Sequence, residues 1–209
     1  VESRGPSWAR NRGLDRADTR YVALLDADDE WFENKLHRQL NKMAETGAGL
    51  CVEGVPMDTE SFMRELYLGN LQSLTSSIVL DTEQVNVRFH EGLDRREDHL
   101  FMLEAASEGG VCLVPDLFNV GRHQESYSHG LTHWHRLRKD VVFSRAVRER
   151  VPEIRKYINS YYQQPRCQTE PVMNTPGDLF RAALLGVAPS TIAFVLLSFM
   201  CQRIHLWLE

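Results

Sequence analysis

The segment that decides the fold is YVALLDADDEW, residues 21–31, because an apolar run stops abruptly at a cluster of acids. Tyr21 to Leu25 has the length and composition of a buried strand, and the acids begin at Asp26. In α/β sheets, ligands bind where strands end at their carboxyl edge. We therefore expect the acids after Leu25 to face a binding site.

Working outward, apolar patterns of helical and strand type alternate on both sides of this segment. Ser7–Ala17 and Asn34–Ala44 read as helices, the second capped by Asn34 and carrying Leu36 and Leu40 on one face. The remaining expected elements are a strand at Leu50–Val52, a helix at Met57–Gly69, a strand at Ser73–Leu80, a helix at Asp98–Ala106 with Leu100, Leu103 and Ala106 inward, and a strand at Val111–Val114. This order predicts an α/β fold with crossover connections.

The acids themselves suit a hard divalent cation. Asp26 and Asp28 are two residues apart, so on a continuing strand both carboxylates would point to one side. Mg²⁺ or Mn²⁺ prefers oxygen ligands and often binds one or two carboxylates together with substrate phosphates. The alternative is an acidic turn that caps the next helix. An aspartyl phosphatase fits poorly, because Asp29, Glu30 and Trp31 follow where such an enzyme has small or β-branched residues.

Three segments, in order, resemble the family 2 glycosyltransferases of the GT-A fold. Gly5–Leu14 resembles the family's G-x-S-x-ARN-x-G helix, and Tyr21–Trp31 resembles its strand and metal motif. Phe89–Asp98 resembles its F-x-E-x-L-x-x-x-ED segment. The resemblance extends over about Gly5 to Gly130, and it implies a mixed Rossmann-like sheet with flanking helices.

The resemblance also implies roles for individual residues. Asp26, Asp28 and Glu30 would hold Mg²⁺ or Mn²⁺, and Asp98 would be the general base that takes the acceptor proton. Arg10, Asp26 and Arg122 would contact the nucleotide-sugar donor. The product would form with inversion, because base and leaving group lie on opposite faces of the sugar.

Two departures from the family pattern are visible. The family's first strands, which hold the nucleobase, have no counterpart before Val1, so we expect a partial GT-A fold that lacks them. The QxxRW motif of processive enzymes is also absent, and Gly121–His129 occupies the comparable region, where Arg122 and His123 would approach the diphosphate.

The C-terminal part divides into three regions after the catalytic core at 1–130. Residues 131–162 carry a basic amphipathic stripe at Trp134, Leu137, Val141, Val147, Val151, Ile154 and Ile158, with a break expected at Pro152. Residues 163–177 read as a linker, and residues 178–209 as hydrophobic helices. The uncharged run Ala182–Cys201 indicates membrane contact, and hence a place at the cytosolic face of a membrane.

Composition excludes some classes of protein. The net charge of −5 argues against a nucleic-acid binder. The four cysteines are far apart, which indicates reduced, buried thiols. His123, His129, His133 and His135 lack the regular spacing of a zinc site, so polar loop or helix-face histidines are favoured.

The leading interpretation is a sugar transferase that uses a nucleotide-sugar donor and a glycan or lipid-linked acceptor. Two alternatives remain open at this point. One is a non-catalytic remnant or partner module, which would expose an unpaired strand edge. The other is a metal-dependent hydrolase that uses the same acids.

Overall fold

A computed structural model describes residues 4–71, 75–119 and 133–157, and the side chains of residues 118–119 and 133–138 are not described. Its helices are α1 (Pro6–Leu14), α2 (Lys35–Thr46), α3 (Thr59–Leu68), α4 (Glu97–Gly109) and α5 (His133–Arg150), with 3₁₀ turns η1 (Thr75–Ser77) and η2 (Pro152–Tyr157). Its strands are β1 (Tyr21–Ala23), β2 (Glu30–Trp31), β3 (Leu50–Glu53), β4 (Val79–Asp81), β5 (Val111–Val114) and β6 (Phe118–Asn119).

The central sheet is mixed, as expected, and has the strand order β1-β4-β3-β5. β3 and β5 are parallel, whereas β4 runs antiparallel to both of its neighbours. A separate two-stranded ribbon pairs β2 with β6. This ribbon was not expected, because two-residue strands carry no periodicity that a sequence can show.

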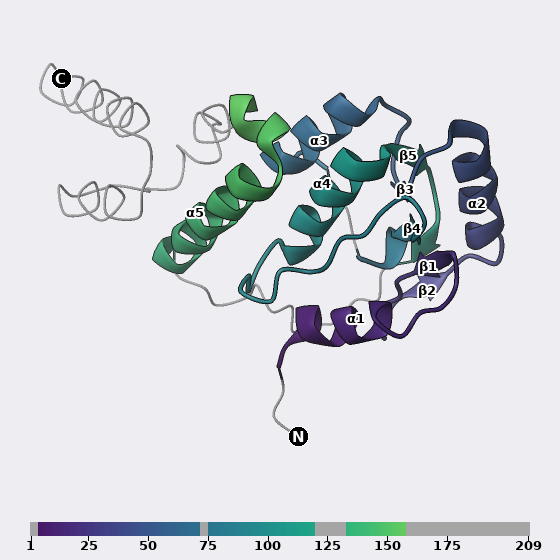
Figure 1. Cartoon of the computed structure of the whole chain (residues 1–209), viewed down its shortest axis with the longest axis horizontal. Helices are drawn as coiled ribbons and strands as arrows, with labels where there is room; N and C mark the ends of the chain where they lie inside the picture. The colour runs from purple at the N-terminus through teal and green to yellow at the C-terminus, as the bar shows by residue number, and fades with distance from the viewer. Residues whose placement is uncertain (1–3, 72–74, 120–132, 158–209) are drawn as a thin grey trace, which may run out of the picture.

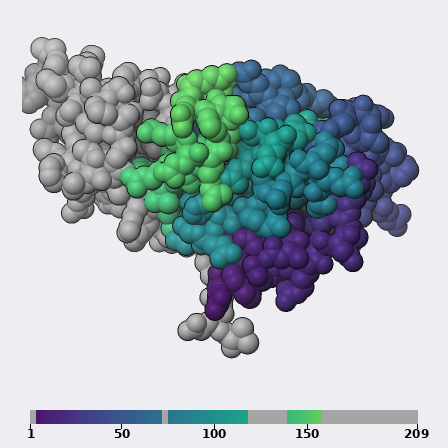
Figure 2. Space-filling model, in the orientation of Figure 1, coloured from purple at the N-terminus to yellow at the C-terminus, as the bar shows by residue number. Residues whose placement is uncertain are grey.

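Helices cover both faces of the sheet (Figure 1). Successive side chains of a strand point to opposite faces, so Leu50 and Val52 pack on the side of α3 and α4, while Cys51 packs on the side of α2. α5 then lies against α4, and the space-filling view shows its green surface beside the teal of α4 (Figure 2). The result is a layered α/β domain whose larger core lies between the sheet and α3–α4.

Most expected elements are confirmed within a few residues. The helix at Glu97–Gly109 buries Leu100, Leu103 and Ala106, and the strand at Val111–Val114 is as predicted. The break at Pro152 is also confirmed, because α5 ends at Arg150 and a 3₁₀ turn begins at Pro152. Trp134, Leu137, Ile158, the linker and the hydrophobic C-terminal segment lie outside the described residues or side chains.

Two sequence expectations were wrong. The inward face of α2 is formed by Lys35, Gln39 and Met43, whereas Leu36 is 39% exposed. The segment expected as a strand at Ser73–Leu80 is a 3₁₀ turn at Thr75–Ser77 followed by the short β4. The Ser76 hydroxyl bonds to Asp26 and Asp29 rather than lying along a strand, so the sheet pairing begins only at Val79.

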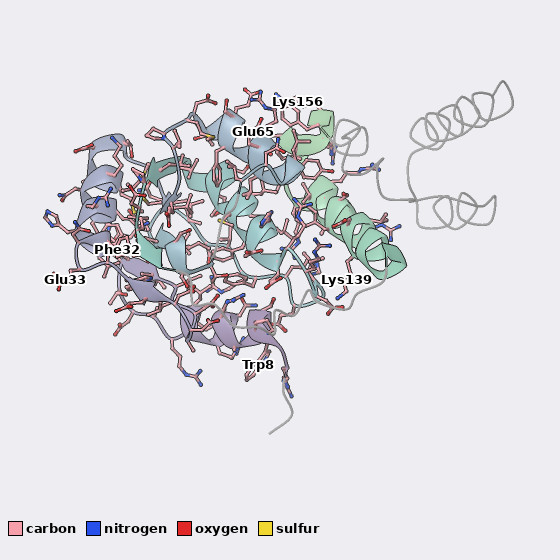
Figure 3. All side chains as sticks on the ribbon, turned by 180° about the vertical axis from the view of Figure 1, so that it is seen from behind. Trp8, Phe32, Glu33, Glu65, Lys139 and Lys156 are labelled. Atoms are coloured by element: carbon pink, nitrogen blue, oxygen red, sulfur yellow. The ribbon has the colours of Figure 1, made fainter. Side chains whose placement is uncertain are left out.

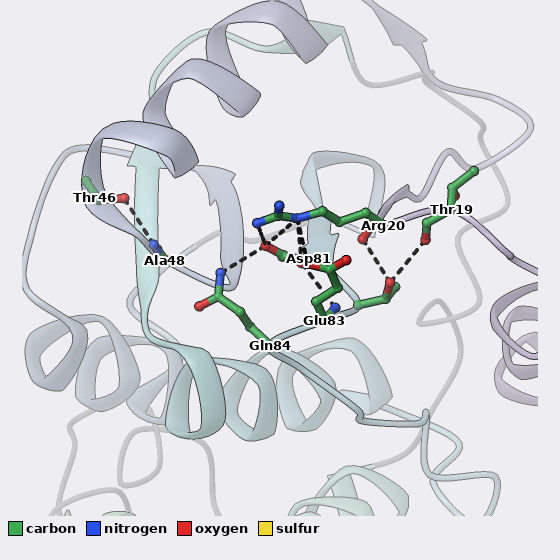
Figure 4. Close-up of polar contacts among 8 residues, drawn as sticks. Thr19, Arg20, Thr46, Ala48, Asp81, Glu83 and Gln84 are labelled. Atoms are coloured by element: carbon green, nitrogen blue, oxygen red, sulfur yellow. Dashed lines mark hydrogen bonds and ion pairs between the residues drawn. The ribbon is translucent and has the colours of Figure 1, made fainter.

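A partly exposed ion pair, between a half-exposed arginine and a buried aspartate, closes the far end of β1 against β4. Arg20 Nη2 donates a hydrogen bond to Asp81 Oδ2 at 2.9 Å, and Gln84 Nε2 donates to the same oxygen (Figure 4). Burial acts to raise the pKa of Asp81, but these hydrogen bonds hold it below its usual value. The pairing of Tyr21 with Asp81 is thereby fixed at the end of the sheet opposite the acidic cluster.

Candidate functional site

The acidic cluster lies on a turn that follows β1, not on the strand itself. β1 ends at Ala23, and the Asp29 amide donates to the Asp26 carbonyl at 3.1 Å, which closes the turn. The expected period-two alternation of Asp26 and Asp28 therefore does not apply, because the strand stops too early. Asp26 is half-buried and Asp28 is exposed.

Ser76 in η1 holds both ends of this turn. The Asp26 amide donates to Ser76 Oγ at 2.9 Å, and the Ser76 hydroxyl donates to Asp29 Oδ2 at 2.5 Å. Ser76 is fully buried, so these hydrogen bonds form away from water. The conformation of the acidic turn therefore depends on a residue about 50 positions later in the sequence.

Glu30 lies beyond the turn, on β2, and its side chain is exposed. Across residues 4–71, 75–119 and 133–157, no three histidine, cysteine, aspartate or glutamate side chains converge as ready-made metal ligands. Asp26 and Asp28 still lie on one turn, and the Asp28 carboxylate is exposed. That arrangement fits Mg²⁺ or Mn²⁺, which commonly uses one or two protein carboxylates and completes its shell with water and phosphate oxygens.

Arg10 links the acidic turn to a second acidic site. From α1, its Nη2 donates to Asp26 Oδ1 at 3.0 Å, and its Nη1 donates to Glu97 Oε1 at 3.2 Å. The Arg10 side chain is 18% exposed, as is that of Glu97. A planar guanidinium with several donors can bind two carboxylates at once, which a lysine cannot reproduce. Arg10 therefore brings segments 16 and 87 residues away into one site.

Glu97 and Asp98 open helix α4, which confirms that Asp98 lies at a helix start. Burial raises the pKa of Glu97, and the adjacent Asp98 charge raises it further. Burial also raises the pKa of Asp98, although its hydrogen bond from the His99 amide at 2.8 Å and the Arg10 charge oppose the rise. A carboxyl with a raised pKa is better matched to proton transfer than one in free solution.

Arg96 fixes the start of α4. It adopts the left-handed backbone region, with φ of 59°, and its Nη2 donates to the Leu66 and Tyr67 carbonyls at 3.1 and 2.6 Å. Its guanidinium also stacks 3.9 Å from the Phe143 ring centroid. Burial lowers the pKa of the neighbouring His99 to about 3, and the Arg96 charge contributes, so His99 is neutral near pH 7.

Asn11, one position after Arg10, fastens α1 to the segment that leads into α4. Its Nδ2 donates to the Phe89 carbonyl at 2.9 Å and to Glu91 Oε1 at 3.0 Å, while its Oδ1 accepts the Phe89 amide at 2.8 Å. The adjacent positions 10 and 11 therefore have separate roles. Arg10 joins the acids, and Asn11 fixes the backbone around them.

The structure thus brings together Arg10, Asp26 and Asp98, whereas Arg122 and His123 lie outside the described residues. Sequence reasoning missed Ser76 and Glu97 as parts of the site. Glu97 was visible as the first acid of the Glu97-Asp98 pair, but nothing local in the sequence distinguishes Ser76 from its neighbours Thr75 and Ser77.

The cysteines and the helices bear on the remaining sequence expectations. Cys51 and Cys112 are free and buried, as expected for reduced thiols, and they lie opposite each other on β3 and β5. No helix in the described ranges has both the length and the apolar character needed to cross a membrane. Trp8 projects from α1, and Phe32 and Glu33 lie at the periphery beside α2 (Figure 3).

Known proteins share sequence similarity with this chain. Residues 1–101 match the family described as "Glycosyl transferase family 2". The chain is 33% identical over 121 residues to the putative teichuronic acid biosynthesis glycosyltransferase TuaG of Bacillus subtilis, a match that covers 52% of this chain and 48% of TuaG. It is 28% identical over 139 residues to the succinoglycan biosynthesis protein ExoO of Rhizobium meliloti, covering 54% of this chain and 40% of ExoO. The chain thus spans about half, or less, of these relatives.

The fold is also found among solved structures. The S. aureus TarS 1-349 structure in complex with UDP-GlcNAc superposes with a TM-score of 0.59 at 16% identity, covering 85% of this chain and 59% of TarS. The structure of TarS 1-349 without that ligand gives a TM-score of 0.54 at 15% identity. Residues 1–101 thus match glycosyl transferase family 2 in sequence, and the chain has the GT-A fold of these structures.

Proposed function

We propose that the chain transfers a sugar from a nucleotide-diphosphate sugar to a glycan acceptor, with inversion at the sugar carbon and with the assistance of Mg²⁺ or Mn²⁺. The observation that supports this most directly is the Arg10 bridge, which joins the acidic turn at Asp26 to the start of α4 at Glu97 and Asp98. One site then contains carboxylates for a cation and a separate carboxyl for proton transfer. Those are the two demands of this chemistry.

In the proposed reaction, the acceptor hydroxyl oxygen forms a bond to the sugar C1 as the bond from C1 to the diphosphate oxygen breaks. Asp98 takes the hydroxyl proton, and it must be ionised to do so. Asp26 and Asp28 would hold the cation, which when bound neutralises charge on the diphosphate leaving group. Arg10 keeps Asp26 oriented, and its charge favours the ionised form of Asp98.

The donor and acceptor classes follow from the relatives. TarS was crystallised with UDP-GlcNAc, so uridine nucleotide sugars are the first donors to test. TuaG and ExoO are named for teichuronic acid and succinoglycan biosynthesis, so a growing polysaccharide is the preferred acceptor. A lipid-linked glycan is the other acceptor class that we propose.

The direct test is a transfer assay with UDP- and GDP-sugars, Mn²⁺ and oligosaccharide acceptors, reading both nucleotide release and the glycosylated product. Asp98→Asn should lower the rate by about 100-fold or more, as loss of a general base does. Glu108→Gln is the matched control on the same helix, because Glu108 is exposed and its contact with the Asn86 amide survives the change. Full activity in Asp98→Asn would contradict the assignment, and release of free sugar without acceptor would indicate a hydrolase.

Membrane contact at the cytosolic face is also proposed, and it has separate support. Arg148, Arg155 and Lys156 are exposed on α5 and the turn that follows it. Clustered cationic side chains attract anionic lipid within about one Debye length. Sedimentation of the chain with anionic vesicles, but not with neutral ones, is the expected result, and equal recovery with both would contradict it.

A further inference from the structure

Lys35 is a fully buried lysine directly behind the acidic turn, and the proposed reaction does not use it. It is the first residue of α2 and has 0% exposure. A buried ammonium is costly unless it is compensated, because it loses its hydration. Burial accordingly lowers the pKa of Lys35 to about 8. A charge kept at such a position calls for a structural or functional reason.

Two neighbours compensate the Lys35 ammonium. Its Nζ donates to Gln39 Oε1 at 2.6 Å and lies 4.1 Å from the centroid of the Trp31 ring. Lys35 and Gln39 are four positions apart, on successive turns of one helix face, and Trp31 lies four positions earlier. Trp31 precedes α2, on β2, and joins the two through its ring contact with Lys35 Nζ; we call these three side chains the Trp31–Lys35–Gln39 column.

The lysine and two backbone carbonyls require the same orientation of the Gln39 amide. An ammonium is a donor only, so it must bind the amide oxygen, and the amide nitrogen is then directed away from it. That nitrogen donates to the Ser77 carbonyl at 2.8 Å. The Cys51 carbonyl, 3.4 Å from the same nitrogen, favours the same orientation, because a carbonyl only accepts. Removal of the Lys35 ammonium would therefore take away the hydrogen bond to the amide oxygen and loosen the Gln39 side chain.

The column reaches the turn η1 at two successive carbonyls. Gln39 binds the carbonyl of Ser77, and Trp31 Nε1 donates to the carbonyl of Ser76 at 2.9 Å. The Ser76 hydroxyl in turn accepts the Asp26 amide and donates to Asp29. A continuous set of contacts thus runs from the buried charge to the acidic turn.

We propose that Lys35 and Gln39 are positioning residues for the acidic turn: together with Trp31 they fix η1, and Ser76 then holds Asp26 to Asp29 in the conformation that binds the cation and diphosphate. This inference rests on the proposed function for its purpose, but the coupling itself is a property of the fold. Replacement of residues that orient metal ligands through hydrogen bonds commonly changes the metal affinity about 10- to 100-fold.

The test compares Lys35→Met with Lys42→Met, which makes the same substitution on the same helix at an exposed residue whose ion pair is with Glu45. Methionine keeps most of the lysine stem, so the core remains filled. Backbone amide exchange measured by NMR at Asp26 and Asp29 reports on the turn, and exchange along Val111–Val114 reports on the sheet. Lys35→Met should speed exchange at Asp26 about fivefold, corresponding to roughly one hydrogen bond, with the sheet unchanged.

Trp31→Phe is the second variant, because it removes the Nε1 donor to Ser76 and keeps an aromatic ring beside Lys35. It should speed exchange at the same two amides. If both variants exchange at Asp26 as Lys42→Met does, the inference is overturned. A merely structural role would instead speed exchange across the sheet as much as in the turn, which would also overturn it.

Direct titration with Mn²⁺ links the coupling to function. Lys35→Met should bind Mn²⁺ about tenfold more weakly than Lys42→Met. Equal Mn²⁺ affinities alongside faster exchange would overturn the role in cation binding. Absence of Mn²⁺ binding in the unaltered chain would instead count against the proposed metal-assisted reaction, and amide exchange would still decide whether the column positions the turn.

Discussion

The perturbation that reports best on the site is Arg10→Met, because it removes the bridge between the acidic turn and α4 while keeping most of the side-chain stem. Two charge-assisted contacts are lost, at 3.0 Å to Asp26 and 3.2 Å to Glu97. Breaking a fully buried ion pair costs about 3–5 kcal/mol, and an exposed pair contributes about 0–1 kcal/mol. With Arg10 and Glu97 at 18% exposure and Asp26 at 39%, we expect a loss of about 2 kcal/mol in the free energy of unfolding.

The assay is urea denaturation followed by circular dichroism. With a slope of about 2 kcal/mol per molar urea, the midpoint of Arg10→Met should fall by about 1 M. The control is Arg12→Met on the same helix, where the guanidinium is 49% exposed and pairs with Asp15, so the midpoint should move by about 0.3 M or less.

Arg10→Met should also change proton binding at the start of α4. The Arg10 charge lowers the pKa of both Glu97 and Asp98, so its removal raises both. The acidic limb of the transfer activity should move to higher pH, because Asp98 would then need a higher pH to ionise. Equal urea midpoints for Arg10→Met and Arg12→Met would refute the reasoning, since the bridge would then contribute nothing to the fold.

Three further predictions follow from the packing. Burial raises the pKa of Asp98 in the folded chain, so ionisation of Asp98 disfavours folding as the pH rises from about 3.8, its pKa in the unfolded chain, through the raised pKa. Asp98→Asn should therefore be more stable than the unaltered chain at pH 7, and this advantage should be gone near pH 3. A variant less stable at pH 7 would contradict this. Asn11→Ala leaves the buried amide and carbonyl of Phe89 without the Asn11 side chain as their partner. The free energy of unfolding, measured by thermal or urea denaturation, should therefore fall by about 3 kcal/mol. A fall of less than about 1 kcal/mol would count against the anchoring role of Asn11. A methyl group at Gly49 would lie 2.6 Å from a valine methyl and 3.1 Å from a backbone atom, so Gly49→Ala should lower the free energy of unfolding by about 2 kcal/mol. Gly13 in α1 has open space around it, so Gly13→Ala should raise that free energy by up to about 1 kcal/mol. The same sign for both variants would be inconsistent with the packing.

The parts of the fold that the sequence predicts well are those with strong apolar patterning. Val111–Val114 is an uninterrupted apolar run, and the helix that begins at Glu97 contains a run from Leu100 to Ala106 that is apolar except for Glu104 and is buried throughout. Both segments form the centre of the larger core, where burial of apolar area dominates the choice of structure. Three motifs in order were also sufficient to indicate the fold family.

The inward face of α2 could not be predicted in this way. Hydropathy favours Leu36 and Leu40 as the inward positions, but Leu36 is exposed, Leu40 packs only partly buried against the smaller core, and the buried residues are Lys35 and Gln39. The reason is polar: these side chains satisfy each other and the carbonyl of Ser77, which lies 38 residues from Gln39. Buried polar groups of this kind are chosen by tertiary partners that a local pattern does not contain.

The same limit applies to the site. Asp26, Asp28 and Asp98 were proposed from motifs, but the setting of Asp26 depends on Arg10 and Ser76 through contacts between distant segments. The early end of β1 at Ala23 also invalidated the argument from strand alternation. Residue types suggest a chemistry for the site, whereas long-range hydrogen bonds decide its geometry.

The central claim is that the acidic turn supports metal-dependent recognition of a nucleotide diphosphate. Calorimetric titration of the chain with UDP and GDP, with and without Mn²⁺, tests this most directly, using Asp28→Ala and, as a control, Glu33→Ala at an exposed acid on the same segment. The account predicts binding that requires Mn²⁺, is lost in Asp28→Ala and persists in Glu33→Ala. Nucleotide binding that is unaffected by Mn²⁺ and by Asp28→Ala would contradict it.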